Sequence, residues 1–114
     1  MDVQRVIPKR GEVWWVNFNP ARGTEIQKNR PAVVLSTDIS NKYLNRMQVV
    51  PLTSNVARIY TSECMLAVKS QKCKAMADQI RTVSIARFGK KIEKLEKENL
   101  SKVELIVKIQ LELE

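Results

Sequence analysis

The side chains that could carry out chemistry in this chain are restricted in type, because its 114 residues include no histidine and only two cysteines. Without histidine, the usual nucleophilic triads and the usual general acid and base near neutral pH are excluded. Cys64 and Cys73 have no second pair of thiols with them, so they do not match a zinc-site pattern and are expected to be buried or half-buried, reduced thiols. Any catalysis must therefore use arginine, lysine, carboxylates, hydroxyls or main-chain groups, and we expect neither a metal nor an organic cofactor.

The charge balance narrows the choice of partner. Twenty lysines and arginines oppose twelve acidic residues, which gives a formal net charge of +8 at pH 7. The basic residues are spread over both halves of the chain, so folding must gather them if they are to form one surface. Such an excess favours a polyanionic partner, although a basic surface that only aids solubility would give the same count.

Length and hydropathy limit the architecture. A chain of this length has room for one apolar core and contains no low-complexity tract, so we expect a single folded domain over residues 1–114. No stretch approaches the roughly 20 apolar residues of a membrane span, and the N-terminus lacks the charged-then-apolar order of a signal peptide. These features predict a cytoplasmic protein without a membrane segment.

The elements that must position the reactive side chains follow from periodicity. Short apolar runs rich in β-branched and aromatic residues predict strands at residues 12–18, 32–36, 47–52, 62–68, 74–80 and 88–95. A helical turn is expected to be capped by Asp38 or Ser40. The charged, leucine-rich stretch from Glu96 or Asn99 onward favours a terminal helix, although the last apolar residues also fit a strand period. The sequence thus predicts a mainly β protein with five to seven short strands in a small, curved antiparallel barrel and one C-terminal helix.

Six short strings occur in one order with plausible gaps, and together they are more specific than any one alone. They are Arg10-Gly11-Glu12-Val13-Trp14, Asn19-Pro20 with Gly23-Thr24-Glu25, Arg30-Pro31, Val50-Pro51-Leu52-Thr53-Ser54, Asp78-Gln79-Ile80-Arg81-Thr82 and Arg87-Phe88-Gly89-Lys90. In content and order, these strings resemble the MazF/PemK family of toxin endoribonucleases. The resemblance extends from Arg10 into the terminal helix.

This resemblance implies an SH3-like barrel that pairs into a homodimer and cleaves single-stranded messenger or ribosomal RNA at short sequences. It also implies neutralisation by an acidic, partly disordered antitoxin resembling MazE, whose carboxylates would lie where RNA phosphates bind. In that family, the arginine of the Arg-Pro step and the threonine of the Thr-Ser step carry most of the chemistry. Those positions are Arg30 and Thr53 in this chain.

RNA can be cut without a metal when its own 2′-hydroxyl attacks the adjacent phosphorus, leaving a 2′,3′-cyclic phosphate and a 5′-hydroxyl. Arg30 suits the stabilisation of the extra negative charge, because its planar fork of donors matches two phosphate oxygens and stays charged. Thr53 could donate a hydroxyl hydrogen bond to the same phosphate, with Ser54 beside it. A guanidinium is a poor base, so Glu25 is the first candidate to accept the 2′-proton and Asp78 the second.

The remaining candidate residues would bind RNA. Trp14 and Trp15 project from opposite faces of one strand, so at most one is buried, and Trp15 could stack on an unpaired base or pack in a dimer contact. Asp78, Gln79 and Arg81 belong to a matched string, although Asp78 and Arg81 could simply form a structural salt bridge. The basic residues expected to contact phosphates are Arg22, Lys28 and Arg58, together with Lys9 and Arg46.

Other interpretations of the same residues remain open. Arg30 could pair with a carboxylate at a strand edge, and the hydroxyls at 53–54 could bond their own backbone in a turn. On the same barrel, the main alternative is a non-catalytic toxin that inhibits DNA gyrase, as the related CcdB group does. That group uses a terminal Trp-Gly-Ile, which disfavours the alternative because this chain ends Leu111-Glu-Leu-Glu114. A plain RNA-binding barrel would have no need of Arg30 together with Thr53.

Overall fold

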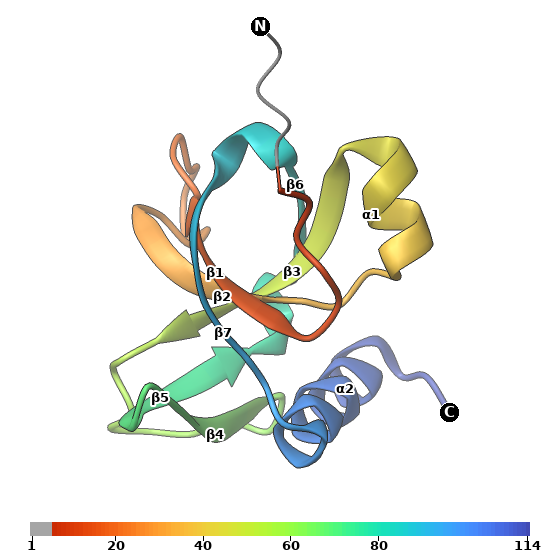
Figure 1. Ribbon diagram of the computed structural model, residues 1–114. Coiled ribbons are helices and arrows are strands. Elements are labelled where there is room, and N and C mark those ends of the chain that lie inside the picture. Colours follow the sequence, from red (N-terminus) through yellow and green to blue (C-terminus); the bar gives the residue numbers. More distant parts are fainter. Residues whose placement is uncertain (1–5) are drawn as a thin grey trace, which may run out of the picture.

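The computed structural model describes residues 6–114, whose strands form one antiparallel sheet that curls into a half-barrel (Figure 1). The strands are β1 (Glu12–Asn17), β2 (Asn29–Val34), β3 (Arg46–Thr53), β4 (Glu63–Val68), β5 (Gln71–Met76), β6 (Arg81–Ser84) and β7 (Phe88–Lys94). The helices are α1 (Asp38–Leu44), α2 (Lys97–Leu111) and two short 3₁₀ turns, η1 (Ala77–Gln79) and η2 (Ile85–Arg87). This architecture confirms the predicted mainly β barrel with a C-terminal helix. Within residues 6–114, no helix combines the length and the apolar character needed to cross a membrane.

Strand β1 shows how alternation along the sequence assigns side chains to faces. It pairs antiparallel with β2, so that Val13 is opposite Val33 and Trp14 is opposite Ala32. Trp14 is buried, and its ring packs edge-on against Phe88 with the ring centroids 6.0 Å apart. Trp15 projects from the other face and is 44% exposed. The prediction that only one of the two tryptophans is buried is therefore confirmed.

Strand β3 joins the two parts of the sheet. One of its edges pairs with β2, and the other pairs with β6 along its first half and with β5 at its end, where Thr53 is opposite Lys74. β5 and β6 pair with the same edge of β3 at different positions along it. The sheet therefore folds around two apolar cores. The first core contains Trp14, Val16, Phe18, Ala32, Val34, Met47, Val49 and Val83. The second contains Val13, Val33, Val50, Leu52, Leu66, Cys73, Ala75, Ala77, Leu95, Val103 and Ile106.

Helix α2 closes the second core, as its position against the β4–β5 side of the sheet in Figure 1 shows. Val103 and Ile106, about one turn apart, are its buried residues. Arg10 fixes the helix to the sheet, because its guanidinium donates to the Leu35 carbonyl and pairs with Glu104. The helix therefore closes the apolar cluster from one side and is held by an ion pair at its margin.

The second half of the sheet differs from the sequence prediction. The prediction of a strand at 74–80 is wrong, since β5 runs from Gln71 to Met76 and the chain then forms the 3₁₀ turn η1. Lys69 and Ser70 have positive φ angles of 51° and 64°, which form a two-residue hairpin turn and let β5 begin earlier. The sequence predicts a polar turn from Lys69 to Lys72 but not its two-residue form, since neither Lys69 nor Ser70 is one of the usual turn formers for this conformation. The sequence did not predict strand β6 either. Only Val83 of its four residues is buried, so the segment has no alternating apolar pattern.

The start of α1 also differs from prediction. Thr37 is the N-cap residue, with extended backbone angles, and its hydroxyl oxygen accepts the Ser40 N–H at 3.3 Å. Asp38 is instead the first helical residue and accepts a hydrogen bond from the Arg10 N–H at 2.8 Å. The expectation that Asp38 or Ser40 caps the helix is therefore wrong, because the cap is Thr37, one residue before Asp38.

Candidate active site

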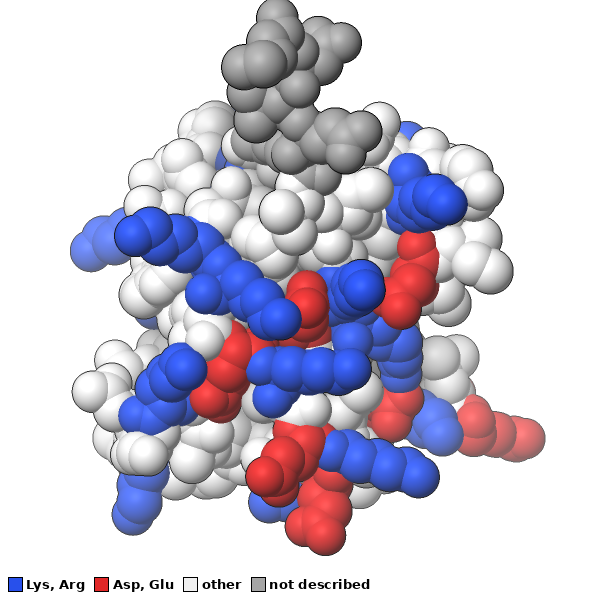
Figure 2. Space-filling model, viewed as in Figure 1, with Lys and Arg blue, Asp and Glu red and all other residues white. Residues whose placement is uncertain are grey.

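Charge on the surface is mixed rather than segregated. Figure 2 shows lysine and arginine side chains crowded across the middle of one face, with acidic side chains among them. Three lysines, Lys90, Lys91 and Lys94, are exposed along β7. A face of mixed sign offers weaker attraction to a polyanion than the net charge suggests. The search for a binding site therefore turns to places where cations gather without carboxylates.

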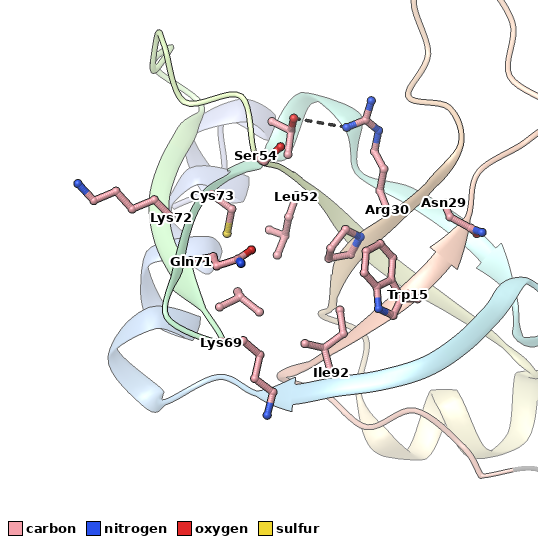
Figure 3. A pocket seen from close by; sticks show the side chains of 13 residues that line it. Trp15, Asn29, Arg30, Leu52, Ser54, Lys69, Gln71, Lys72, Cys73 and Ile92 are labelled. Atoms are coloured by element: carbon pink, nitrogen blue, oxygen red, sulfur yellow. Dashed lines mark hydrogen bonds between the residues drawn. The ribbon is translucent and has the colours of Figure 1, made fainter.

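One such place is a groove of about 480 Å³ beside the second core (Figure 3). Its base is apolar and includes Trp15, Pro31, Leu52 and Ile92, which come from β1, β2, β3 and β7. The polar residues around it are Asn29, Arg30, Thr53, Ser54, Lys69, Gln71 and Lys72. None of the described residues that line the groove is acidic, whereas three are cationic. An apolar base with a cationic margin suits a ligand that carries both flat bases and phosphates.

Arg30 and Thr53, the two residues expected to carry the chemistry, meet at this groove although they are 23 residues apart. Arg30 Nε donates to the Gln27 carbonyl at 3.0 Å, and Nη1 reaches Thr53 Oγ1 at 3.4 Å. The Asn55 N–H also donates to Thr53 Oγ1, at 3.3 Å. Because this oxygen accepts both bonds, its own hydroxyl proton can be donated to a ligand. The pair thus presents a guanidinium and a hydroxyl donor at one end of the groove.

Trp15 is the largest apolar side chain that lines the groove. Its ring is partly exposed and is drawn beside the groove together with Ile92 in Figure 3. At Gly89 on β7, a Cβ atom would lie 3.5 Å from the Trp15 Cβ, which is an ordinary van der Waals distance, so β7 packs directly beside the tryptophan. The exposed ring fits either a stacked base or a protein contact, the two alternatives left open by the sequence.

The candidate general base does not line the groove. Glu25 is exposed, and its Oε1 accepts the Arg22 N–H at 2.6 Å within the loop between β1 and β2. Arg22 and Lys28 are exposed on this loop, and Asp78 is exposed on η1. The catalytic role of Glu25 and the RNA contacts of the other three stay predictions.

Gln79 and Arg81 hold the same loop in place. The Gln79 side-chain oxygen accepts the Ile26 N–H at 3.1 Å. Arg81 Nη1 donates to the Phe18 carbonyl at 3.3 Å, and its guanidinium carbon lies 5.9 Å from the centre of the Phe18 ring. The interpretation of Asp78 and Arg81 as a salt bridge is wrong, because no ion pair joins them in the described part of the chain. Arg81 instead bonds a neutral carbonyl.

Burial and hydrogen bonding perturb the ionisation of a few groups near the sheet. Burial alone would raise the pKa of Glu12, but hydrogen bonds from Lys91, from the Lys9 N–H and from Trp14 outweigh it and lower the pKa of this carboxyl. The Lys91 Nζ lies 2.9 Å from Glu12 Oε2. Glu12 therefore stays ionised and joins β1 to β7, which carries Ile92 into the groove.

The two cysteines are unpaired thiols near the second core. Burial raises the pKa of Cys64, and the positive charge of Lys102 partly offsets this effect. Burial is also the main cause that raises the pKa of Cys73, with smaller contributions in the same direction from Cys64 and Glu93. A raised pKa leaves little thiolate at neutral pH and makes a thiol a poor nucleophile. Cys73 is buried and Cys64 is half-buried, as expected, and Cys73 also lines the groove.

Sequence reasoning missed part of the groove margin. Asn29, Lys69, Gln71 and Lys72 line it but were not predicted as site residues. Lys69 and Lys72 bound the polar turn predicted at 69–72, and two lysines within four residues are a signal of a cationic margin. Arg58, predicted to bind phosphate, lies on the exposed loop that follows Ser54, outside the groove lining.

A small curled sheet with a groove lined by cations and hydroxyls has the features of a protein that binds a phosphate-bearing polyanion. Residues 9–111 match the family described as PemK-like, MazF-like toxin of type II toxin-antitoxin system. The chain belongs to this family.

Relatives with names and structures agree with this assignment. The chain is 36% identical over 114 residues to endoribonuclease MazF9 of Mycobacterium tuberculosis, covering 92% of this chain and 97% of the relative. It is similar in structure to MazF from Deinococcus radiodurans, with a TM-score of 0.84, 26% identity and coverage of 96% of this chain and 100% of that one. A MazE–MazF crystal structure from the same organism gives a TM-score of 0.77 at 27% identity, with the same coverage. The predicted family and fold are thus confirmed.

Proposed function

We propose that this chain is an endoribonuclease toxin that cleaves single-stranded RNA at specific sequences without a metal ion. The observation that carries the proposal is the contact between Arg30 Nη1 and Thr53 Oγ1 at the cationic groove. The named relative MazF9, which is similar over nearly the whole chain, is an endoribonuclease and supports the same class of activity here. None of the relatives described above is named as a gyrase inhibitor, so the alternative toxin activity is not favoured.

The proposed reaction is an internal displacement at phosphorus. The 2′-oxygen forms a bond to phosphorus while the bond from phosphorus to the 5′-oxygen breaks, giving a 2′,3′-cyclic phosphate and a 5′-hydroxyl. Among the described contacts, Arg30 uses Nε and Nη1 within the protein, so other N–H groups of its fork can face the phosphorane oxygens. Thr53 donates its hydroxyl proton to the same phosphate. Donors already in position cost no reorganisation when charge develops, which is where such sites gain most rate.

Proton transfer is assigned to the loop between β1 and β2. We assign the 2′-proton to Glu25, and the 5′-oxygen takes up a proton from water as it leaves. The hydroxide that remains then takes the proton from Glu25 and re-forms water. Gln27 in the same loop accepts the Arg30 Nε hydrogen bond, so the loop and the guanidinium are physically joined. RNA that displaces the Arg22 N–H from Glu25 would release the carboxylate toward the groove. Glu25→Gln should therefore lower the rate, and full activity of this variant would remove Glu25 from the mechanism.

The proposed partners follow from the charge of the groove and from the family. An acidic antitoxin segment would place carboxylates against Arg30, Lys69 and Lys72, and a MazE–MazF complex is the subject of one similar structure. Such an interaction should weaken as salt increases. We also propose a homodimer, with Trp15 as a candidate contact, which sedimentation of the purified protein would test.

The proposed function is tested with a long single-stranded RNA in the presence of EDTA. The wild-type protein should release fragments with 2′,3′-cyclic phosphate and 5′-hydroxyl ends, and Arg30→Ala should release them far more slowly. Cleavage that needs added Mg²⁺ would contradict metal independence. Retardation of intact RNA would favour a binding barrel, and the absence of both effects would lead to a gyrase supercoiling assay.

A further inference from the structure

Outside the groove, the structure contains a buried ion pair that the proposed chemistry does not use. Lys74 on β5 is only 7% exposed, and its Nζ lies 2.8 Å from Glu63 Oε1 at the start of β4. The two side chains are 9% and 8% exposed, respectively. Removing two charges from water is unfavourable unless their remaining hydrogen bonds are satisfied, so the other contacts of the pair are informative.

Those contacts all come from the loop of residues 54–62 that follows β3. Lys74 Nζ donates to the Arg58 carbonyl at 2.8 Å and lies 5.3 Å from the centre of the Tyr60 ring. Glu63 Oε1 accepts the Tyr60 N–H at 2.8 Å. The Arg58 guanidinium carbon lies 5.8 Å from the same ring. Two backbone groups and one ring of an otherwise exposed loop therefore converge on the ion pair.

The same ion pair is adjacent to the candidate catalytic pair. Thr53 on β3 is directly opposite Lys74 on β5, and directly opposed residues of an antiparallel pair project from the same face of the sheet. The loop begins immediately after Thr53, with Ser54 lining the groove. Lys74 thus contacts the loop from the position opposite Thr53 and fixes where Arg58 lies relative to the candidate catalytic centre.

We infer that the Lys74–Glu63 pair is a specificity-determining device that holds the loop of residues 54–62 in one conformation and so selects the nucleotides accepted beside the scissile phosphate. The inference rests on the proposed ribonuclease activity. Lys74 and Glu63 act through the loop and do not touch the RNA, so they are positioning residues. Arg58 is the group through which a change in the loop reaches a neighbouring phosphate.

The test replaces the pair by apolar side chains of similar length in the double variant Lys74→Met/Glu63→Met. Exchanging a buried ion pair for apolar residues is often neutral for stability, whereas removing one partner leaves a buried charge. The control Lys108→Met removes one positive charge from an exposed position on α2. Cut sites on a long RNA are mapped for all three proteins, and amide exchange of Tyr60 is measured by NMR.

The double variant should show faster exchange of the Tyr60 amide, by about tenfold or more, because its acceptor is gone. The ratio of kcat/KM between the preferred site and the next best site should fall by about tenfold, and new cut sites should appear. The control should match the wild type in both measurements. An unchanged site ratio, or an unchanged Tyr60 amide, in a variant that still cleaves RNA overturns the inference alone. A wild type that cleaves no RNA overturns the proposed function, and the inference with it.

Discussion

Replacing Arg30 by alanine should lower kcat by about 10²–10³-fold while leaving the fold intact. The guanidinium is half-buried at the groove margin, where its donors are held by the Gln27 carbonyl and by Thr53 Oγ1. A donor fixed in this way stabilises charge that develops in the transition state more than charge in the ground state. The loss should therefore appear mainly in kcat, with a smaller change in KM.

Two further variants separate charge from geometry at this position. Arg30→Lys keeps the positive charge but loses the planar fork, so its rate should lie between those of wild type and Arg30→Ala. Thr53→Val keeps the branched shape on β3 and removes one neutral hydrogen-bond donor, for which about a tenfold loss is expected. Lys108→Ala, which removes a charge outside the groove lining, is the control and should match the wild type.

The assay is single-turnover cleavage of a short RNA that contains one mapped site, with thermal unfolding of each variant measured in parallel. A melting temperature near that of the wild type would show that a lost rate is not lost folding. If Arg30→Ala, correctly folded, cleaved within about threefold of the wild-type rate, the guanidinium could not be the main stabiliser of the phosphorane.

Three other predictions concern ionisation and binding. Glu12→Gln should lower the free energy of unfolding by about 1–2 kcal/mol at about pH 7. Because the pKa of Glu12 is lowered by folding, its contribution is present above the ordinary pKa of 4.5 and is lost as pH falls through the folded-state value, so urea titrations should show the two proteins converging in acid. Cys64 and Cys73, whose pKa values are raised, should react with iodoacetamide at least about tenfold more slowly in the folded protein than in urea, as mass spectrometry would show; equal rates would contradict their burial. In a cleavage-deficient background, Lys69→Ala and Lys72→Ala should each reduce the salt slope of RNA binding by about 0.7, measured by anisotropy, and unchanged slopes would place the RNA elsewhere.

Some features of the fold and the site could be predicted from local sequence. The alternating pattern around Trp14 and Trp15 assigned them to opposite faces, because side chains on a strand alternate whatever the strand pairs with. The matched strings identified Arg30 and Thr53 as the central pair, and the structure brings them together. The charged, leucine-rich C-terminal stretch predicted α2 correctly, since helix propensity and periodicity act within a few turns.

Other features depended on contacts between distant segments, which no local pattern records. Glu25 bonds its own loop instead of facing the groove, because the loop conformation depends on where Gln79 and Arg81 hold it. The groove margin at Lys69 exists only because β4 and β5 pair through a two-residue turn and β5 pairs with the end of β3.

The sequence by itself determined the residue types available for chemistry, the alternation of the strands and the family. Only the tertiary structure decided which cations line the groove and that Lys74, opposite Thr53, is buried with Glu63. The physical reason is that alternation and helix propensity act between near neighbours in the chain, whereas strand register and the burial of charge depend on how the whole sheet closes.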